Sequence, residues 1–595
     1  MNELKRGVDE WYVGDDGHPV PWMTWHLEEK LPLLKGNVEF LRRFVEDRLQ
    51  ATSPTEVPAL VITAFNELAL RLQAGGSPDL RAWLAQVAKR SVSSGFRYPY
   101  LDELMGFESG RHAARIVARL LAHPFEAADA FLASAEHQMV AAAKQLGAFA
   151  PIEGAMGLLV EAMARGIPAK RISTSLPLYR LGQGARQKSV WRGFTVHTSH
   201  IGTVAATQKH VANELLRSVG LPVPRQRRVL DAATAVQAAW DIGFPVVVKP
   251  ASTDFGTAVS VGVRNETELE VAFGSAHAHG AVLIEEQLPG DDHRLVVVDG
   301  RFVAAIRRRP AQVVGDGVSD VKKLLVRMAE ARRADPAHSI YRAATLDDPL
   351  VQETLRRQHL TGRSIPAAGQ VVMLRLNANV STGGTYSDVT GDVHPDNARL
   401  AERAALCMGL DHAGIDFLTP DIAKPWHKIQ SGICEINPTP GMGVPAIKSV
   451  LDYLFPDGSN GRIPVVVVVG KPPDASVVVE AVRERARATG RVPGAVLDGM
   501  VTIDGACACR DERPARALLE LLLADAAVGL VVVQVSVDEI LQYGLGVSRC
   551  DLAVFLTGLA EVRSVTMSAR STVGCAGVTL VKPTPDDLRE ALQVM

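Results

Sequence analysis

Two strand-like segments between residues 413 and 441 constrain this chain more than any other feature. Asp416 lies in the apolar segment AGIDFL, and nineteen residues later Glu435 and Asn437 alternate in ICEIN, just before a Pro-Gly turn. Residues i and i+2 of a strand point to one face, so pairing of the two segments would bring Asp416 to Glu435 and Asn437. Two carboxylates and an amide oxygen suit Mg²⁺ that carries ATP phosphates. The alternative is a surface hairpin whose acids are simply solvated.

Length and composition set the broad class of the protein. The 595 residues are 47% hydrophobic, which is enough for three or four domains. Because 64 basic residues balance 66 acidic ones, the charge gives no reason to expect a nucleic-acid or membrane partner. The longest apolar runs have strand length, the N-terminus lacks an apolar signal core, and the six cysteines are scattered. We therefore expect a cytoplasmic protein without a disulfide framework or a zinc site.

Apolar periodicity divides the chain into regions of different structure. Helical spacing recurs up to about residue 150, in segments 39–49, 65–73 and 113–123. Strand patterns follow from about 165 to 200, then a helix at about 203–219, and then strands alternate with helices. The segment LVVVDGRFVAAIRR predicts a hairpin that turns at Asp299-Gly300. These patterns indicate an α/β multidomain protein whose middle region is α+β with an antiparallel sheet.

A third region begins near Arg462 and has a different pattern. The apolar runs IPVVVVVG, GLVVVQV and DLAVFLTG read as buried strands, and a helix is expected at about 474–488. Continuous apolar strands with helices between them are typical of a parallel α/β layer.

A nucleotide site is predicted upstream of the Asp416 segment. Lys249 ends the apolar strand FPVVVKP, and the loop PASTDFGTAVSV that follows offers N–H donors, so the two form a plausible phosphate clamp. In VLIEEQLPGDDHR, the strand that ends in Glu285 and Glu286 could present backbone groups to an adenine edge, and Asp292 could reach a ribose. The alternative for these acids is a solvated turn.

The order of these features resembles the ATP-grasp superfamily, whose members join a carboxylate to an amine through an acyl-phosphate. The order is an early Lys209, VVVKP, a small-residue loop, an acidic-ended strand with a PG turn, and D…ExN. Longer stretches closely resemble the ATP-grasp domain of cyanophycin synthetases: 289–305, 307–325, 365–397 and 410–422, with 181–190 also similar. The resemblance is strong from about 165 to 470, weaker to 558, and only topological before 150.

The resemblance implies roles for individual residues. Lys209 and Lys249 look like phosphate-contacting lysines, and Asp292, His293 and Arg294 match the DHR motif of the family. The metal ligands would be Asp416, Glu435 and Asn437. The phosphate and acyl-phosphate loops would hold Arg308, Arg375, Asn379, Ser381, Thr382, Gly383 and Gly384. Hydroxyls and glycine N–H groups around a γ-phosphoryl, with an arginine to offset its charge, also make sense unaided, although the STGG segment could be a plain turn.

Several positions depart from the family pattern and leave the acceptor substrate open. The loop near NHGRGV reads DFGTAV at 254–259 here, which looks more like the fused glutathione-synthesising ATP-grasp enzymes. Gln312 replaces a histidine, and Val318 replaces a lysine that follows the GDG segment. Both positions are candidates for substrate contact, so the specificity is expected to differ.

The third region resembles a Mur-ligase domain that has lost its site. Where the family continues into the P-loop GTNGKTT, residues 470–476 read GKPPDAS. Asp474 stands in place of the phosphate-binding lysine, and two prolines remove N–H donors. The ETARGGIL pattern, at 534–541, lacks its glutamate and its arginine. We expect this domain to be truncated and inactive, and to serve packing or oligomerisation.

The combined prediction is a three-domain ATP-dependent ligase. The domains would be a cyanophycin-synthetase-like helical or α+β domain (1–164), an ATP-grasp domain (165–458) and a truncated Mur-ligase-like domain (459–595). ATP and Mg²⁺ would serve a homo-oligomer that acts on small peptides or amino acids, with a polymer primer as a further partner. The resemblance favours polymerisation of β-Asp-Arg or related dipeptides. The alternatives are a glutathione-synthetase-like ligase that makes a small peptide, and a non-catalytic nucleotide-binding regulatory protein.

Overall fold

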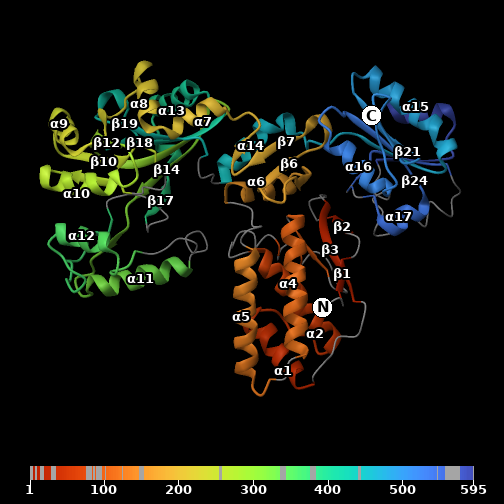
Figure 1. Ribbon diagram of the computed structural model, residues 1–595, viewed down its shortest axis with the longest axis horizontal. Helices are drawn as coiled ribbons and strands as arrows, with labels where there is room; N and C mark the ends of the chain where they lie inside the picture. The colour runs from red at the N-terminus through yellow and green to blue at the C-terminus, as the bar shows by residue number, and fades with distance from the viewer. Residues whose placement is uncertain are drawn as a thin grey trace. The chain divides into compact units, whose positions relative to one another are not determined.

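The computed structural model describes residues 4–6, 10–13, 19–27, 35–74, 84, 88, 97–100, 102–122, 125–146, 153–252, 258–334, 344–375, 384–439, 444–545, 547, 549–556 and 577–593. The chain forms two compact units: residues 193–454 make one, and residues 1–192 together with 455–595 make the other. Both are drawn in Figure 1, coloured along the chain. The division into three domains at residues 164 and 458 stays a prediction.

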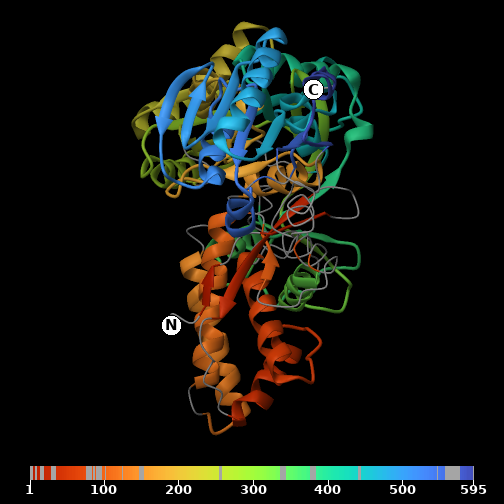
Figure 2. The same ribbon diagram turned by 90° about the vertical axis from the view of Figure 1, so that its right-hand side faces the viewer.

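The N-terminal part of the first unit is mainly helical. Its long helices are α1 (Lys35–Arg43), α2 (Val57–Ala74), α4 (Glu103–Ala122) and α5 (Ala128–Leu146), and they pack together in the red and orange region of Figure 2. Phe65, Leu68 and Leu120 are fully buried. The helices predicted from apolar spacing are thus confirmed. A small antiparallel sheet, in which β3 (Pro19–Leu27) pairs with β1 (Leu4–Arg6), β2 (Glu10–Val13) and β4 (Arg97–Pro99), belongs to the same unit.

The C-terminal part of this unit is the predicted parallel α/β layer. β20 (Val465–Val469) lies between β24 (Leu530–Val535) and β25 (Leu552–Phe555), and all three are parallel. β21 (Pro493–Leu497) and β26 (Val578–Val581) extend the parallel sheet, and the hairpin of β22 (Met500–Ile503) and β23 (Ala506–Arg510) forms an edge. Helices cover both faces, which explains the unbroken valine run of β20.

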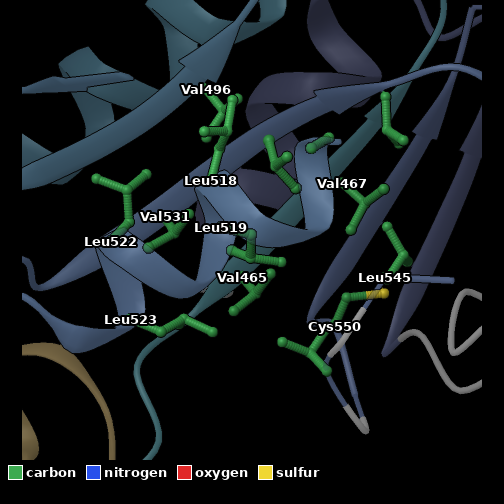
Figure 3. Packing of buried hydrophobic residues seen from close by; sticks show 14 of the residues in the cluster. Val465, Val467, Val496, Leu518, Leu519, Leu522, Leu523, Val531, Leu545 and Cys550 are labelled. Carbon is green, nitrogen blue, oxygen red and sulfur yellow. The ribbon is translucent and has the colours of Figure 1, made fainter. Parts of the chain in front are cut away.

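Successive valines of β20 point to opposite faces of the parallel sheet. Val465 and Val467 pack with Leu518, Leu519 and Leu522 of α16 (Ala515–Ala524), as Figure 3 shows. The intervening valines, Val466 and Val468, pack with α15 (Pro472–Ala488).

The second unit contains a four-stranded antiparallel sheet. Its strands, in spatial order, are β11 (Ser260–Val263), β10 (Val246–Pro250), β12 (Val282–Glu286) and β9 (Gln226–Val229). Helices α9 (Ala232–Ile242) and α10 (Glu266–His277) bury one face together with Val246, Val248 and Ile284. Because side chains alternate along a strand, Lys249 and Glu285 lie on the other face.

A five-stranded antiparallel sheet carries most of the predicted site. Its strands, in spatial order, are β17 (Thr385–Asp388), β14 (Arg301–Arg309), β13 (Asp291–Val298), β18 (His412–Thr419) and β19 (Gly432–Asn437). Helices α7 (His200–Thr207), α8 (Lys209–Ser218) and α13 (Pro395–Met408) bury one face with Leu295, Ile415 and Phe417. A smaller core surrounds the pair of β15 (Gln312–Val314) and β16 (Val371–Met373), with α11 (Val321–Ala334) and α12 (Pro349–Arg357).

Local geometry confirms one predicted turn and corrects one predicted helix. Asp299 and Gly300 have φ values of 50° and 69°, the positive values that a tight two-residue hairpin requires, so the β13–β14 turn lies where predicted. The single helix expected at 203–219 is instead α7 followed by α8. The two are separated at Gln208, whose ψ of 89° is not helical. None of the described helices is long and apolar enough to cross a membrane.

Candidate active site on the five-stranded sheet

Strand register places the predicted site residues in two adjacent rows across the sheet. The first row takes one residue from each of β19, β18, β13, β14 and β17: Glu435, Asp416, Arg294, Ile306 and Asp388. The second row, from β18 to β17, is Leu418, Asp292, Arg308 and Tyr386. Directly opposed residues of an antiparallel sheet share a face. Both rows therefore lie on the face that turns away from α7, α8 and α13.

Asp416 is the centre of a network of charged hydrogen bonds. Its Oδ1 accepts from Arg294 Nε at 2.5 Å, and its Oδ2 lies 2.9 Å from Arg308 Nη2. Arg308 Nη2 also donates to both carboxylate oxygens of Asp292, at 2.8 and 2.9 Å. Arg308 thus holds two carboxylates of different strands together. Such charge-assisted bonds are stronger than neutral ones, so the network fixes the positions of all four side chains.

Burial and charge act against each other in this network. Burial raises the pKa of Asp416, but Arg294 and Arg308 more than offset it, so its pKa lies below the usual value. At Asp292, burial and the charge of Asp416 outweigh Arg308, and the pKa is raised. Burial lowers the pKa of Arg308, yet the two carboxylates raise it far above its ordinary value. The site therefore presents an ionised Asp416 and a permanently charged Arg308.

The D…ExN segment folds as its spacing predicts. β18 and β19 pair with Asp416 opposite Glu435, and Asn437 Nδ2 lies 3.4 Å from Asp416 Oδ2. The register shifts at Cys434, because Phe417 pairs with Ile433 and the cysteine is left over. A bulge of this kind re-aims neighbouring side chains. Here it accompanies an ion pair of 3.1 Å between Glu435 Oε1 and Lys209 Nζ, from the first residue of α8.

The second predicted lysine lies in a buried ion pair. Lys249 Nζ is 2.8 Å from Glu285 Oε2, and both side chains are almost completely buried. Burial lowers the pKa of Lys249, but Glu285 and more distant acids raise it overall, so the lysine is charged. Glu286 points elsewhere: it accepts from the backbone N–H of Arg225 at 3.1 Å and from its Nε at 3.2 Å.

Other predicted residues lie apart from this cluster. His293 is buried on the opposite face of β13, where its Nδ1 lies 3.0 Å from the Asp291 carbonyl oxygen. Arg375 follows β16 and forms an ion pair with Asp348. Gly384 is buried directly before β17. The remaining predicted phosphate-loop residues lie outside the described residues: Asn379, Ser381, Thr382 and Gly383.

Three residues on or beside the site face were not singled out from the sequence. Tyr386 and Asp388 extend the two rows onto β17, and Cys434 occupies the bulge. Burial raises the pKa of the Cys434 thiol well above its usual value, and the charge of Glu285 adds to this. The alternation that placed Glu435 with Asn437 would also have placed Tyr386 with Asp388, but the position of β17 beside β14 is not visible in the sequence.

The donor set fits Mg²⁺ that is bound together with a triphosphate. The oxygens of Asp416, Glu435 and Asn437 are the hard ligands that Mg²⁺ prefers, and Mg²⁺ is usually held by one or two carboxylates plus phosphates. No group of three His, Cys, Asp or Glu side chains arranged to hold a metal by itself occurs in the described part of the chain. The carboxylates of the site are paired with cationic side chains, so the site can accept a charged ligand. The carboxylates are those of Glu285, Asp292, Asp416 and Glu435, and the cations are Lys209, Lys249, Arg294 and Arg308.

The segment that begins at Gly470, where the sequence predicts a degenerate P-loop, packs closely against neighbouring residues. Gln534 Nε2 donates to the Gly470 carbonyl oxygen at 2.9 Å, and a Cβ at Gly470 would lie 2.9 Å from Leu556 Cβ. Helix α15 begins with Pro472 and Pro473, so its first turn offers fewer N–H donors. That this region is a truncated, inactive Mur-ligase-like domain stays a prediction.

Known proteins resemble the chain in two ways. Residues 208–322 match the family model of the carbamoyl-phosphate synthase L chain, ATP binding domain. The cyanophycin synthetase of Synechocystis sp. is 30% identical over 494 residues, 80% of this chain and 56% of the relative. That of Nostoc sp. is 31% identical over 480 residues, which cover 78% and 53%. The chain spans about half the length of these curated relatives.

Glutathione-synthesising proteins are similar over a shorter part. The glutathione biosynthesis bifunctional protein GshAB of Mannheimia succiniciproducens is 30% identical over 339 residues, 55% of this chain and 43% of that protein. A solved bifunctional glutathione synthetase from Pasteurella multocida has a TM-score of 0.39 and 25% identity, and it covers 60% of this chain and 53% of its own. The sequence similarity to cyanophycin synthetases therefore covers more of the chain than the similarity to glutathione-synthesising proteins does.

Proposed function

We propose that the chain, which belongs to the cyanophycin synthetase family, is an ATP-dependent ligase that forms an amide bond through an acyl-phosphate. The observation that carries this proposal is the Arg308 bridge between Asp292 and Asp416. It joins β18, which carries the expected metal ligand Asp416, to β13 and β14, which carry the expected nucleotide-binding Asp292 and Arg308 itself.

The residues of the site have defined tasks in this reaction. Lys209 and Lys249 would bind the phosphates of ATP, and Asp416, Glu435 and Asn437 would hold the accompanying Mg²⁺, which neutralises phosphate charge. A substrate carboxylate oxygen then bonds to the γ-phosphorus as the bond to the ADP oxygen breaks. Arg308, fixed by its two carboxylates, offsets the charge that develops there. An amine next attacks the acyl carbon, phosphate leaves, and the nitrogen loses a proton.

The finer proposal concerns the substrate. One ATP site is supported, at the five-stranded sheet, whereas the contacts of Gly470 and the prolines of α15 oppose a second one. Building an aspartate backbone and attaching arginine to its side chains are two different ligations. A chain with one working site is therefore expected to join ready-made dipeptides such as β-Asp-Arg. Its proposed homo-oligomeric state, polymer primer and cytoplasmic location rest on the family resemblance and the composition.

The test compares free amino acids with the dipeptide. ATP and Mg²⁺ are supplied with either aspartate plus arginine or β-Asp-Arg, and ADP, phosphate and product mass are measured. We expect product only from the dipeptide, with one ADP for each bond, and none with Lys249→Gln. A branched polymer made from free aspartate and arginine would contradict the proposal.

A second candidate is a glutathione-synthetase-like ligase that adds one unit once. The loop DFGTAV at 254–259 and the similarity to GshAB over 55% of the chain favour it. A product of defined mass with a single new amide bond, obtained with another amino acid, would support this candidate. A purely regulatory nucleotide-binding role is disfavoured by the expected metal ligands Asp416, Glu435 and Asn437, which occur together with the expected phosphate-binding residues Lys209 and Lys249.

A further inference from the structure

Arg375 is anchored near the active site, although the strand before it belongs to the smaller core around β15 and β16. Its backbone N–H lies 3.3 Å from the carbonyl oxygen of Ala311, which follows Arg308 by three residues in the chain. Three residues span at most about 11 Å. The Arg375 backbone is therefore fixed close to the end of β14, where Arg308 lies.

The protein satisfies only part of the Arg375 guanidinium. The side chain is 14% exposed, and its Nη2 donates to Oδ2 of Asp348. Its Nε is buried and has no hydrogen-bond partner in the described part of the chain. Arg308 has the same pattern, since its Nη2 binds carboxylates while its Nε is buried without a partner. Buried N–H groups are almost always paired, so each arginine keeps a donor for an anionic ligand.

Asp348, which was not singled out from the sequence, holds Arg375 from a fixed position. Its Oδ1 accepts from the backbone N–H of Leu350 at 2.9 Å and caps α12, while its Oδ2 accepts from Arg375. The two oxygens of one carboxylate thus have two different tasks. Val351 of α12 and Leu374, directly before Arg375, pack in the same core. Because helix and strand share this core, the carboxylate and the guanidinium keep a fixed separation.

We propose that Asp348 is a positioning residue of the ligase reaction, which holds the Arg375 guanidinium so that its Nε meets the phosphoryl group being transferred. This inference rests on the proposed ligase function. An ion pair between two mobile side chains contributes little, but here a helix cap fixes the acid and a core fixes the base. An arginine that is oriented in advance stabilises transition-state charge without rearrangement during the reaction. Asp348 acts through Arg375.

The test separates the two tasks of the Asp348 carboxylate. Asparagine has a single carbonyl oxygen, so Asp348→Asn keeps the cap of α12 but turns an N–H group towards Arg375. We expect this variant to lower kcat about ten- to a hundredfold, with an unchanged KM for ATP. Asp231→Asn is the matched control, because Asp231 caps α9 by accepting from the Thr234 backbone N–H at 2.9 Å and has no ion pair among the described residues. Both variants should melt at nearly the wild-type temperature.

A double-mutant cycle decides whether Asp348 acts through Arg375. We expect Arg375→Gln to lower kcat about a hundredfold or more, and adding Asp348→Asn to it to cause no further loss. Losses that multiply in the double variant would overturn the inference. Wild-type kcat in Asp348→Asn, or an equal loss in Asp231→Asn, would overturn it as well.

A binding measurement separates this inference from the proposed function. Calorimetry with ADP, Mg²⁺ and aluminium fluoride, which mimics a phosphoryl group in transfer, does not require ligation. We expect Asp348→Asn to weaken binding of this mixture about tenfold and to leave binding of ADP alone unchanged. That result supports the positioning role even where no amide bond forms and the proposed function fails. Equal affinities of wild type and Asp348→Asn for the mixture contradict the positioning role, and so does the absence of binding to wild type.

Discussion

Lys249 and Glu285 form a buried ion pair whose charged atoms lie 2.8 Å apart on neighbouring strands. Lys249 is opposite Leu283, and Glu285 is opposite Val247, so the two are diagonal neighbours on the face of the sheet away from α9 and α10. The side chains are only 8% and 6% exposed. A phosphate-binding lysine in such a place is held in position and charged before the nucleotide arrives.

From the Lys249–Glu285 ion pair we predict that substitutions can change the stability of the fold and the binding of nucleotide independently. Lys249→Met leaves the Glu285 carboxylate buried without its cation, and we expect it to lower the free energy of unfolding by about 3–5 kcal/mol. Adding Glu285→Leu removes the orphaned charge, so the double variant should recover most of that loss yet still fail to bind ATP. Thermal unfolding and calorimetry with an ATP analogue measure the two effects. Nucleotide binding by the stable double variant would remove Lys249 from the phosphate site.

The metal ligands give a second prediction. We expect Asp416→Asn, Glu435→Gln and Asn437→Ala each to reduce kcat at least about a hundredfold, because each removes an oxygen that neutralises phosphate charge through Mg²⁺. Glu435→Gln is the most informative of the three, since its side chain is partly exposed and its ion pair among the described residues is the one with Lys209. Asp421→Asn, beyond the end of β18, is the control for loss of an acid. Near wild-type turnover in folded Glu435→Gln would refute the assignment.

The strand arrangement of the site was largely predictable. Period-two alternation placed Glu435 with Asn437, and the structure adds Asp416 opposite Glu435 as expected. The same rule separates His293 from Asp292 and Arg294, although the three form one continuous motif in the sequence. The alternation of side chains along a strand depends only on neighbouring residues, so it can be predicted from the sequence. The contribution of each residue to ATP binding stays a prediction.

Long-range register and local irregularities were not predictable. Arg294 meets Asp416 because β13 pairs with β18, and the two residues are 122 positions apart. Nothing in either segment specifies that register. The bulge at Cys434 and the break at Gln208 likewise depend on how neighbouring elements pack, since neither residue is a glycine or a proline that would signal an interruption.

A third prediction follows from the pKa of Asp411, which is lowered to about 2. Burial raises this pKa, but His412, whose Nδ1 lies 3.1 Å away, and Thr195, which donates at 2.5 Å, more than offset the effect. A folded-state pKa below the unfolded value of about 3.9 stabilises the fold above pH ~4, and this stabilisation is lost as the pH falls towards 2.

We therefore expect Asp411→Asn to lower the free energy of unfolding of the unit 193–454 by about 2–3 kcal/mol at pH 7 and by about half of that at pH 3. Thermal melting of the variant and of wild type at several pH values measures this difference. Asp392→Asn, at an exposed acid of the same unit, should show almost none. A difference that stays constant from pH 7 to pH 3 would mean that the carboxylate charge does not stabilise the fold.

The last prediction concerns the nucleotide stoichiometry of the whole chain. We expect one ATP analogue to bind per chain, because Gln534 donates to the Gly470 carbonyl oxygen, Leu556 lies close to Gly470, and the prolines of α15 withhold N–H donors. Asp474→Lys restores the charge that a P-loop lysine would supply but changes none of these contacts. It should therefore leave the stoichiometry at one and create no additional ATP hydrolysis.

Calorimetry on wild type, Asp474→Lys and the Lys249→Met/Glu285→Leu double variant measures this. The double variant is the informative comparison, since it removes the expected site while the sheet of β20 to β26 is untouched. No binding to it is expected, even when Asp474→Lys is added. A stoichiometry of two in wild type that falls to one in the double variant would contradict this prediction, because the chain would then hold a second ATP that does not depend on Lys249.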